Sequence, residues 1–416
     1  MTTAQRLSTL LSVALDGEPP IRIRAWDGSV AGPDGASLVE VRSRAALRRM
    51  LWEPNELGVA QSYVTGALEV PGGADELAAG LRGMWQYARA TGKPRPRLSP
   101  ARRLRLAAAA VRLGAVGPRP AAPRSQATVS GSVHSRARDR AVIGHHYDLS
   151  NDFYSMILDP SMAYSSAYYC APGMSLGLAQ QVKLDLICRK LELEPGQRLL
   201  DVGCGWGSLS LYAARHFGAR VLGVTISERQ HEFVTRQIAE QRLADRVEVR
   251  LQDYRELREA PFDAVSSIEM GEHVGEANYP SYLQVLFDHL RPGGRLLLQQ
   301  MSRPADAAPG GGAFIENYIA PDMHMRPVEQ TIGQLETAGL EILDVQPMRE
   351  HYVRTVADWL TNFEANYDAA VAMVGEEVAR VWRLYLIGGG LSFAEGRMGV
   401  DQLLAMRLPP PVQRGG

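Results

Sequence analysis

A ten-residue stretch beginning at Leu199 constrains the fold of this chain more than any other segment. Its sequence is Leu-Leu-Asp-Val-Gly-Cys-Gly-Trp-Gly-Ser, with glycines at 203, 205 and 207, and a helix-like pattern follows it. The stretch predicts a buried strand, a tight glycine turn and the first turn of a helix. At such a junction, main-chain N–H groups can approach a nucleotide closely. An ordinary strand-to-helix turn can also contain glycines, so the motif alone is a weak signal.

Two details separate this turn from the dinucleotide-binding fingerprint G-x-G-x-x-G. The third glycine follows the second by two residues instead of three, and the segment 221–226 has no acidic residue where a ribose would be bound. The spacing D-x-G-x-G-x-G is similar instead to motif I of class I methyltransferases, which bind S-adenosylmethionine.

Strand-like and helix-like segments alternate after this point. The predicted strands are 198–202, 220–224, 247–251, 262–268 and 295–300. This alternation predicts an α/β fold with a parallel, doubly wound (Rossmann-like) sheet. Ligands of such sheets bind at the carboxyl ends of the strands. Four segments that follow predicted strands are therefore candidates for the site: 203–207, 225–230, 252–254 and 269–273.

The rest of the chain divides by composition. Residues 1–90 predict a small mixed α/β domain, with strands at 21–26 and 38–41 and helices at 44–51 and 76–90. Residues 91–130 form a basic linker rich in Pro, Arg and Ala, with a helix predicted at 101–113. That helix is either a solvated linker or a helix that lies on an anionic surface such as phospholipid headgroups. Residues 131–416 are predicted to form the catalytic domain.

Composition argues against several classes of protein. A net charge of −1 gives no support for nucleic acid binding, and three cysteines without paired spacing predict neither a disulfide framework nor a zinc site. No signal peptide is evident, and no apolar run reaches the roughly 18–20 residues that span a bilayer. We expect a cytoplasmic protein whose membrane contact is peripheral, at the inner face.

Seven segments together resemble the cyclopropane-fatty-acyl-phospholipid synthases and the related mycolic acid methyltransferases. They are residues 144–152 (GHHYDLSND), 164–168 (YSSAY), 200–207, 223–227, 251–255, 272–279 (EHVG with Asn278-Tyr279) and 318–321. Residues 57–70 also resemble the small N-terminal domain of the phospholipid-acting members. The resemblance implies a class I methyltransferase fold with lipid-binding insertions in residues 131–416.

The resemblance also implies a set of residues that bind S-adenosylmethionine, with Gln230 in place of the missing ribose carboxylate. The set is Tyr164, Ser165, Asp201, Gly203, Gly205, Gly207, Thr225, Gln230, Asp253 and Tyr254.

In the resembling enzymes a bicarbonate ion acts as the base, held by a cysteine, a glutamate, a histidine and a tyrosine. Glu272 and Tyr352 match two of these, whereas Ser166 replaces the cysteine and Gln299 lies where the family has its histidine segment. Tyr318 is a further candidate, because aromatic faces stabilise a desolvated cation. The expected catalytic set is therefore Ser166, Glu272, Gln299, Tyr318 and Tyr352, with bicarbonate as an additional ion.

These residues imply methyl transfer from S-adenosylmethionine to the double bond of an unsaturated acyl chain in a membrane phospholipid, through a carbocation. The product is a methylene-branched or a cyclopropane chain, and the replaced residues favour the methylene branch, which a separate reductase could consume. We expect a homodimer that contacts an anionic membrane surface. The alternatives are a methyltransferase for a small secondary metabolite and an inactive lipid-binding relative.

Overall fold

The computed structural model describes residues 1–91, 100–127, 131–147 and 149–409, without the side chains of 100–103 and 145–147. Asp148 and the side chains of His145 and His146, which carried part of the resemblance, therefore lie outside the described residues.

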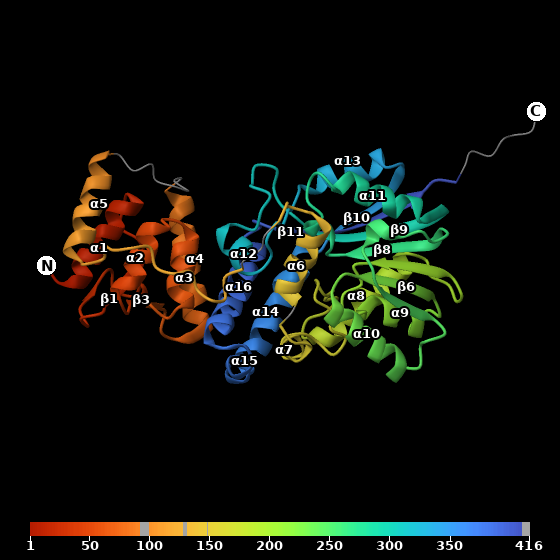
Figure 1. Ribbon diagram of the computed structural model, residues 1–416, viewed down its shortest axis with the longest axis horizontal. Helices are drawn as coiled ribbons and strands as arrows, with labels where there is room; N and C mark the ends of the chain where they lie inside the picture. The colour runs from red at the N-terminus through yellow and green to blue at the C-terminus, as the bar shows by residue number, and fades with distance from the viewer. Residues whose placement is uncertain (92–99, 128–130, 148, 410–416) are drawn as a thin grey trace, which may run out of the picture. The chain divides into compact units, whose positions relative to one another are not determined.

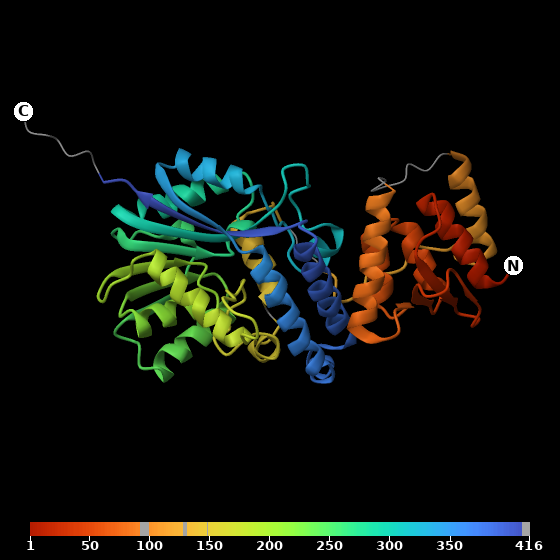
Figure 2. The same cartoon turned by 180° about the vertical axis from the view of Figure 1, so that it is seen from behind.

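Two compact units are distinguished (Figure 1, Figure 2). Unit 1 comprises residues 1–126, 313–318 and 367–391, and unit 2 comprises 127–312, 319–366 and 392–416. This division differs from the three consecutive segments expected from the sequence, because two segments of the C-terminal half belong to unit 1.

Unit 1 contains a small mixed sheet in the order β2-β1-β3-β4. Strands β1 (Ile21–Ala25) and β3 (Ser37–Val41) are parallel, whereas β2 (Val30–Ala31) and β4 (Leu68–Glu69) pair antiparallel with β1 and β3. The helices of this unit are α1 (Thr3–Leu15), α2 (Arg44–Trp52), α3 (Glu56–Val64), α4 (Gly73–Ala90), α5 (Pro100–Arg112), α12 (Ala313–Tyr318), α15 (Tyr367–Val374) and most of α16 (Glu376–Ala394).

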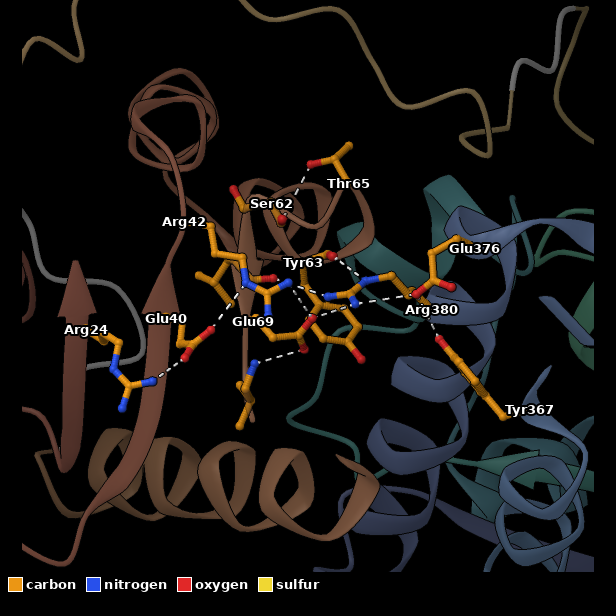
Figure 3. A network of polar contacts seen from close by, with 12 residues as sticks. Arg24, Glu40, Arg42, Ser62, Tyr63, Thr65, Glu69, Tyr367, Glu376 and Arg380 are labelled. Carbon is orange, nitrogen blue, oxygen red and sulfur yellow. Dashed lines mark hydrogen bonds and ion pairs between the residues drawn. The ribbon is translucent and has the colours of Figure 1, made fainter. Parts of the chain in front are cut away.

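One buried arginine of α16 links this helix to the N-terminal elements of unit 1 (Figure 3). The Arg380 Nε–H donates to the Tyr63 carbonyl at 2.7 Å, and its Nη1 donates to a carboxylate oxygen of Glu69 at 2.7 Å. The guanidinium also lies 4.1 Å from the centroid of the Tyr63 ring. Only 7% of the Arg380 side chain is exposed. A charge buried to this extent requires such partners, so these contacts hold α16 in unit 1.

Unit 2 is built on a seven-stranded sheet in the order β10-β11-β9-β8-β5-β6-β7. The strands are β5 (Arg198–Val202), β6 (Arg220–Thr225), β7 (Val247–Leu251), β8 (Phe262–Ile268), β9 (Leu290–Ser302), β10 (Leu340–Pro347) and β11 (Gly399–Arg407). The five predicted strands, β5 to β9, are present and mutually parallel. Strands β10 and β11 were not predicted, and β11 runs antiparallel to both of its neighbours.

Helices cover both faces of this sheet, because successive strand residues point to opposite sides. Leu200 packs in one core cluster with α11 (Tyr279–Asp288) and α13 (Val328–Thr337). Leu199 packs in a second cluster with α8 (Leu176–Lys190), α9 (Ser208–His216) and α10 (Glu228–Glu240). Figure 1 shows these two groups of helices on opposite sides of the strands. The helices of unit 2 are α6 (Arg136–Tyr147), α7 (Asn151–Ser155), α8 (Leu176–Lys190), α9 (Ser208–His216), α10 (Glu228–Glu240), α11 (Tyr279–Asp288), α13 (Val328–Thr337) and α14 (Arg349–Ala365). Within the described ranges, no helix is long and apolar enough to cross a bilayer.

The glycine turn predicted after β5 leads directly into α9. Gly203, Gly205 and Gly207 have φ values of +76°, +55° and +78°, a region that other residues rarely adopt. A Cβ atom on Gly207 would also lie 2.9 Å from the Val234 side chain of α10. The third glycine is therefore required for packing between the turn and α10.

Candidate active site

A cavity opens at the carboxyl ends of β5, β6 and β8, where ligands of such sheets are expected. Every residue that lines it belongs to unit 2. Nine of the ten residues expected to bind the cofactor line it: Tyr164, Ser165, Asp201, Gly203, Gly205, Thr225, Gln230, Asp253 and Tyr254. Gly207 does not line it, in keeping with its packing role against α10.

Side-chain hydrogen bonds fix the polar residues around the glycine turn. Asp201 is 1% exposed and accepts from the hydroxyls of Ser210 at 2.7 Å and Ser266 at 2.9 Å. Burial raises the pKa of the Asp201 carboxyl above its ordinary value. The Thr225 hydroxyl donates to the Gln230 side-chain oxygen at 2.8 Å, which fixes the Gln230 amide in the cavity wall.

The Asp253 carboxylate is engaged by a residue that the sequence analysis did not select. Arg255 donates to it from Nε at 2.8 Å and from Nη2 at 2.6 Å, and Nη2 also contacts Asp139 at 2.9 Å. Burial opposes ionisation of Asp253, but its hydrogen bonds with Arg255 hold the pKa of the carboxyl below its ordinary value. Asp139 and Arg255 also line the cavity, so an ion-pair cluster forms part of this wall.

On another part of the wall, three of the expected catalytic residues surround a carboxylate that was not predicted. Glu269 accepts hydrogen bonds from the Ser166 N–H at 2.9 Å, the Gln299 side-chain amide at 2.8 Å and the Tyr352 hydroxyl at 2.7 Å. Ser166 contributes its main chain only, because its hydroxyl donates to the Ala167 carbonyl at 3.1 Å. Ser166 therefore binds Glu269 through its main chain.

Lys183 of α8 was also missed, because a single lysine in a helical pattern predicts a solvated side chain. It is 1% exposed, and its ammonium donates to the Ser165 hydroxyl at 2.8 Å. Burial lowers the pKa of Lys183 to about 8, and the opposite charges of Glu269, Asp159 and Asp201 limit this fall. The Lys183 ammonium is therefore a buried cation at the cavity wall.

Glu272, the expected catalytic glutamate, lies close to Glu269 but has different partners. It is 1% exposed, and one of its carboxylate oxygens accepts from the Met301 N–H. Burial, together with the nearby charge of Glu269, raises the pKa of Glu272 to about 8. At neutral pH Glu272 therefore carries a proton.

Replacing Glu272 by glutamine should remove a pH dependence of stability between pH 6.5 and 8. The folded protein keeps the Glu272 proton up to about pH 8, whereas the unfolded chain loses it near 4.5. The free energy of unfolding of the wild type should fall as pH rises, by about 1.4 kcal/mol per pH unit and so by about 2 kcal/mol over this window. His273, whose pKa burial lowers to about 4, acts in the opposite direction but only below its ordinary value of 6.5. Urea denaturation of both proteins at the two pH values measures the effect, and an equal fall in the variant would assign it to another group.

The aromatic residues near these carboxylates lie in different environments. Tyr352 stacks on Phe393 with centroids 4.3 Å apart, and Trp359 lies 5.8 Å from Tyr352 and 5.2 Å from Tyr164. Tyr279 is covered instead, because the Arg326 guanidinium lies 3.5 Å from its ring centroid. Tyr318 belongs to α12 of unit 1, so its role beside these residues stays a prediction.

A family model described as mycolic acid cyclopropane synthetase matches residues 134–403 of the chain. The chain belongs to this family. A probable fatty acid methyltransferase of Mycobacterium tuberculosis is 37% identical over 408 residues, which cover 95% of this chain and 92% of that protein. The cyclopropane-fatty-acyl-phospholipid synthase of Escherichia coli is 37% identical over 257 residues, or 61% of this chain and 65% of that one.

Solved structures of the mycolic acid cyclopropane synthetase family also match. The mycolic acid cyclopropane synthase CmaA1, in complex with SAH and CTAB, is 30% identical, with a TM-score of 0.61 over 64% of this chain and 98% of that chain. The cyclopropane synthase MmaA2 of Mycobacterium tuberculosis is 29% identical, with the same TM-score and coverage. The predicted family and the predicted Rossmann-like methyltransferase fold are therefore confirmed, and the chain is a methyltransferase of a lipid-modifying family.

Proposed function

We propose that this protein transfers a methyl group from S-adenosylmethionine to the double bond of an unsaturated acyl chain in a membrane phospholipid. The observation that carries the proposal is the cavity, whose wall joins the glycine turn of a nucleotide site to Glu269 and its cluster. The similarity to a probable fatty acid methyltransferase over 95% of the chain supports the same substrate class.

The cavity residues fit this cofactor in both shape and charge. Gly205 has no protein atom within 4 Å of where a Cβ would lie, so the turn leaves open space in the wall. Asp253 and Glu269 place negative charge around that space, which suits a positively charged sulfonium. Bound there, S-adenosylmethionine supplies an electrophilic methyl group.

An isolated double bond is a poor nucleophile, so the protein has to align it and exclude water. Tyr164 lines the cavity and provides an apolar ring surface for this purpose, with the Trp359 ring centroid 5.2 Å from its own. The Tyr164 ring would also stabilise the cation that methyl transfer leaves on the acyl chain, by roughly 2 kcal/mol or more.

The fate of that cation decides the product. If the new methyl group loses a proton at once, its carbon bonds to the cationic carbon and a cyclopropane ring closes. If a hydride first moves from the methylated carbon to the cationic one, loss of a methyl proton gives a methylene branch (C=CH2) on the chain. We propose the methylene-branched product, because the base pocket contains Ser166 and Gln299 in place of the residues that the cyclopropane-forming relatives are expected to have.

Contact with an anionic membrane surface is proposed for α5. Leu104 and Val111, seven residues apart on one side of this helix, are 73% and 64% exposed. Arg105 and Arg112 are exposed beside them. Apolar side chains flanked by arginines are typical of helices that lie on acidic lipid headgroups.

The test is incubation of the protein with methyl-labelled S-adenosylmethionine and vesicles of dioleoyl phosphatidylglycerol. Label should enter the fatty acids of these vesicles and not those of dipalmitoyl phosphatidylglycerol, which has the same headgroup but no double bond. Dioleoyl phosphatidylcholine, which carries no net charge, should be labelled more slowly. Absence of label from every unsaturated lipid would contradict the proposal and favour a small-molecule substrate.

A further inference from the structure

Glu269 has a backbone conformation that a glutamate rarely adopts. It follows the last residue of β8, and its φ is +51°, in the left-handed region that favours glycine. Strain of this kind persists where the surrounding structure imposes it, and it is concentrated at functional sites. The position of the Glu269 carboxylate is therefore set by the contacts around it.

Those contacts come from three separate elements. The Ser166 N–H and the Gln299 amide both donate to one carboxylate oxygen, at 2.9 and 2.8 Å, and the Tyr352 hydroxyl of α14 donates to the other at 2.7 Å. The Gln299 amide is oriented in turn by Gln402 of β11, whose Nε2 donates to its oxygen at 2.9 Å. Both oxygens of Glu269 are thus held in one geometry.

The same carboxylate reaches the cavity. Glu269 is half-buried, and it lines the cavity together with Asp201, Gly203 and Lys183. Burial raises the pKa of Glu269, while its hydrogen bonds and Lys183 oppose that rise. A carboxylate beside the cavity whose pKa is raised is better suited to accept a proton than an ordinary carboxylate.

A bicarbonate ion does not fit this pocket. The Ser166, Gln299 and Tyr352 donors that would bind its oxygens already donate to Glu269. The Met301 N–H, a fourth donor nearby, is taken by Glu272. The side chain of Glu269 thus presents the planar O–C–O group that a bound bicarbonate would otherwise supply.

We propose that Glu269 itself is the catalytic base of this enzyme, in place of a bound bicarbonate ion. The inference rests on the proposed function. A Glu269 oxygen accepts a proton from the transferred methyl carbon, and the C–H electron pair becomes the second bond of the methylene group, or the closing bond of a ring. The protonated Glu269 then returns its proton to solvent after the product leaves.

Two substitutions at this position test the assignment. Glu269→Gln keeps the shape of the side chain but cannot accept the proton, so turnover should fall by about 100-fold or more, while affinity for the uncharged product S-adenosylhomocysteine stays close to that of the wild type. Glu269→Gly suits the φ of +51° and frees the three donors. Its activity should be low in carbonate-free buffer and should be restored by added bicarbonate. The matched control is Glu232→Gln, an exposed glutamate of α10, which should behave as the wild type.

A second readout does not depend on activity. The NMR signal of ¹³C-bicarbonate should broaden on addition of the Glu269→Gly protein but not of the wild type.

Wild-type turnover should also be unchanged when carbonate is removed. Wild-type turnover that requires bicarbonate, or full activity of Glu269→Gln, would overturn the assignment while leaving the proposed function intact. Absence of turnover by the wild type on every unsaturated lipid would instead contradict the function.

Discussion

Replacing Arg380 by methionine should reduce the stability of unit 1 by about 3–5 kcal/mol. Methionine keeps much of the apolar volume but removes the charge that Glu69 faces at 2.7 Å and the donor to the Tyr63 carbonyl. The cost is large because only 7% of the Arg380 side chain and 16% of the Glu69 side chain are exposed. The remaining contact of Glu69, from Arg42 at 3.4 Å, comes from a half-exposed side chain and is weaker. Hydrogen exchange of peptides from α3 and β4 measures the change.

The same unit offers a matched control in Arg24→Met. Arg24 and Glu40 form an ion pair at 2.6 Å (Figure 3), but 47% of the Arg24 side chain is exposed. Exposed pairs contribute little, so this variant should lose less than about 1 kcal/mol. Equal effects of the two substitutions would show that the contacts of Arg380 do not stabilise unit 1.

Replacing Gly205 by leucine should weaken the binding of S-adenosylmethionine by about 100-fold, or about 3 kcal/mol. Gly205 lines the cavity, and the absence of protein atoms within 4 Å of its missing Cβ means that a leucine would extend into ligand space. The φ of +55° adds a conformational cost of about 1–2 kcal/mol to the folded protein. Isothermal titration calorimetry measures the affinity.

Gly196→Leu is a control that has the conformational cost of placing leucine at a positive φ but leaves the cofactor cavity unchanged. Gly196 has a φ of +86° and also has no protein atom within 4 Å of its missing Cβ, but it is exposed in the turn before β5 and does not line the cavity. This variant should lose similar stability and keep wild-type affinity. If both variants bind S-adenosylmethionine as the wild type does, the cavity at Gly205 is not the cofactor site.

The central sheet and the glycine turn could be predicted because their signals are local. Each of the strands β5 to β8 is a short run rich in apolar residues, and the three glycines lie where the chain needs a positive φ. Strand β11 was missed because it carries buried polar residues. Asp401 accepts from the Ser302 hydroxyl at 2.6 Å and Gln402 donates to Gln299, so their partners are on β9, about a hundred residues earlier.

The candidate site was predicted only in part for the same reason. The resemblance selected Glu272, Gln299, Ser166 and Tyr352, but the residue that joins three of them is Glu269. Its segment was recognised as following a strand, yet nothing local distinguishes Glu269 from Glu272 until Ser166 and Tyr352 are brought to it. Arg380 was missed in the same way, since a lone arginine in a helical pattern predicts a solvated side chain.

The most direct test of the account is the structure of the product formed from S-adenosylmethionine with a trideuterated methyl group and dioleoyl phosphatidylglycerol. Loss of one methyl hydrogen to the base predicts two deuteriums in each modified chain, and mass spectrometry counts them. NMR spectroscopy should place them on the terminal carbon of a methylene branch (C=CD2). Cyclopropane ring signals would contradict the proposed product, and three retained deuteriums would contradict proton removal from the methyl carbon by Glu269.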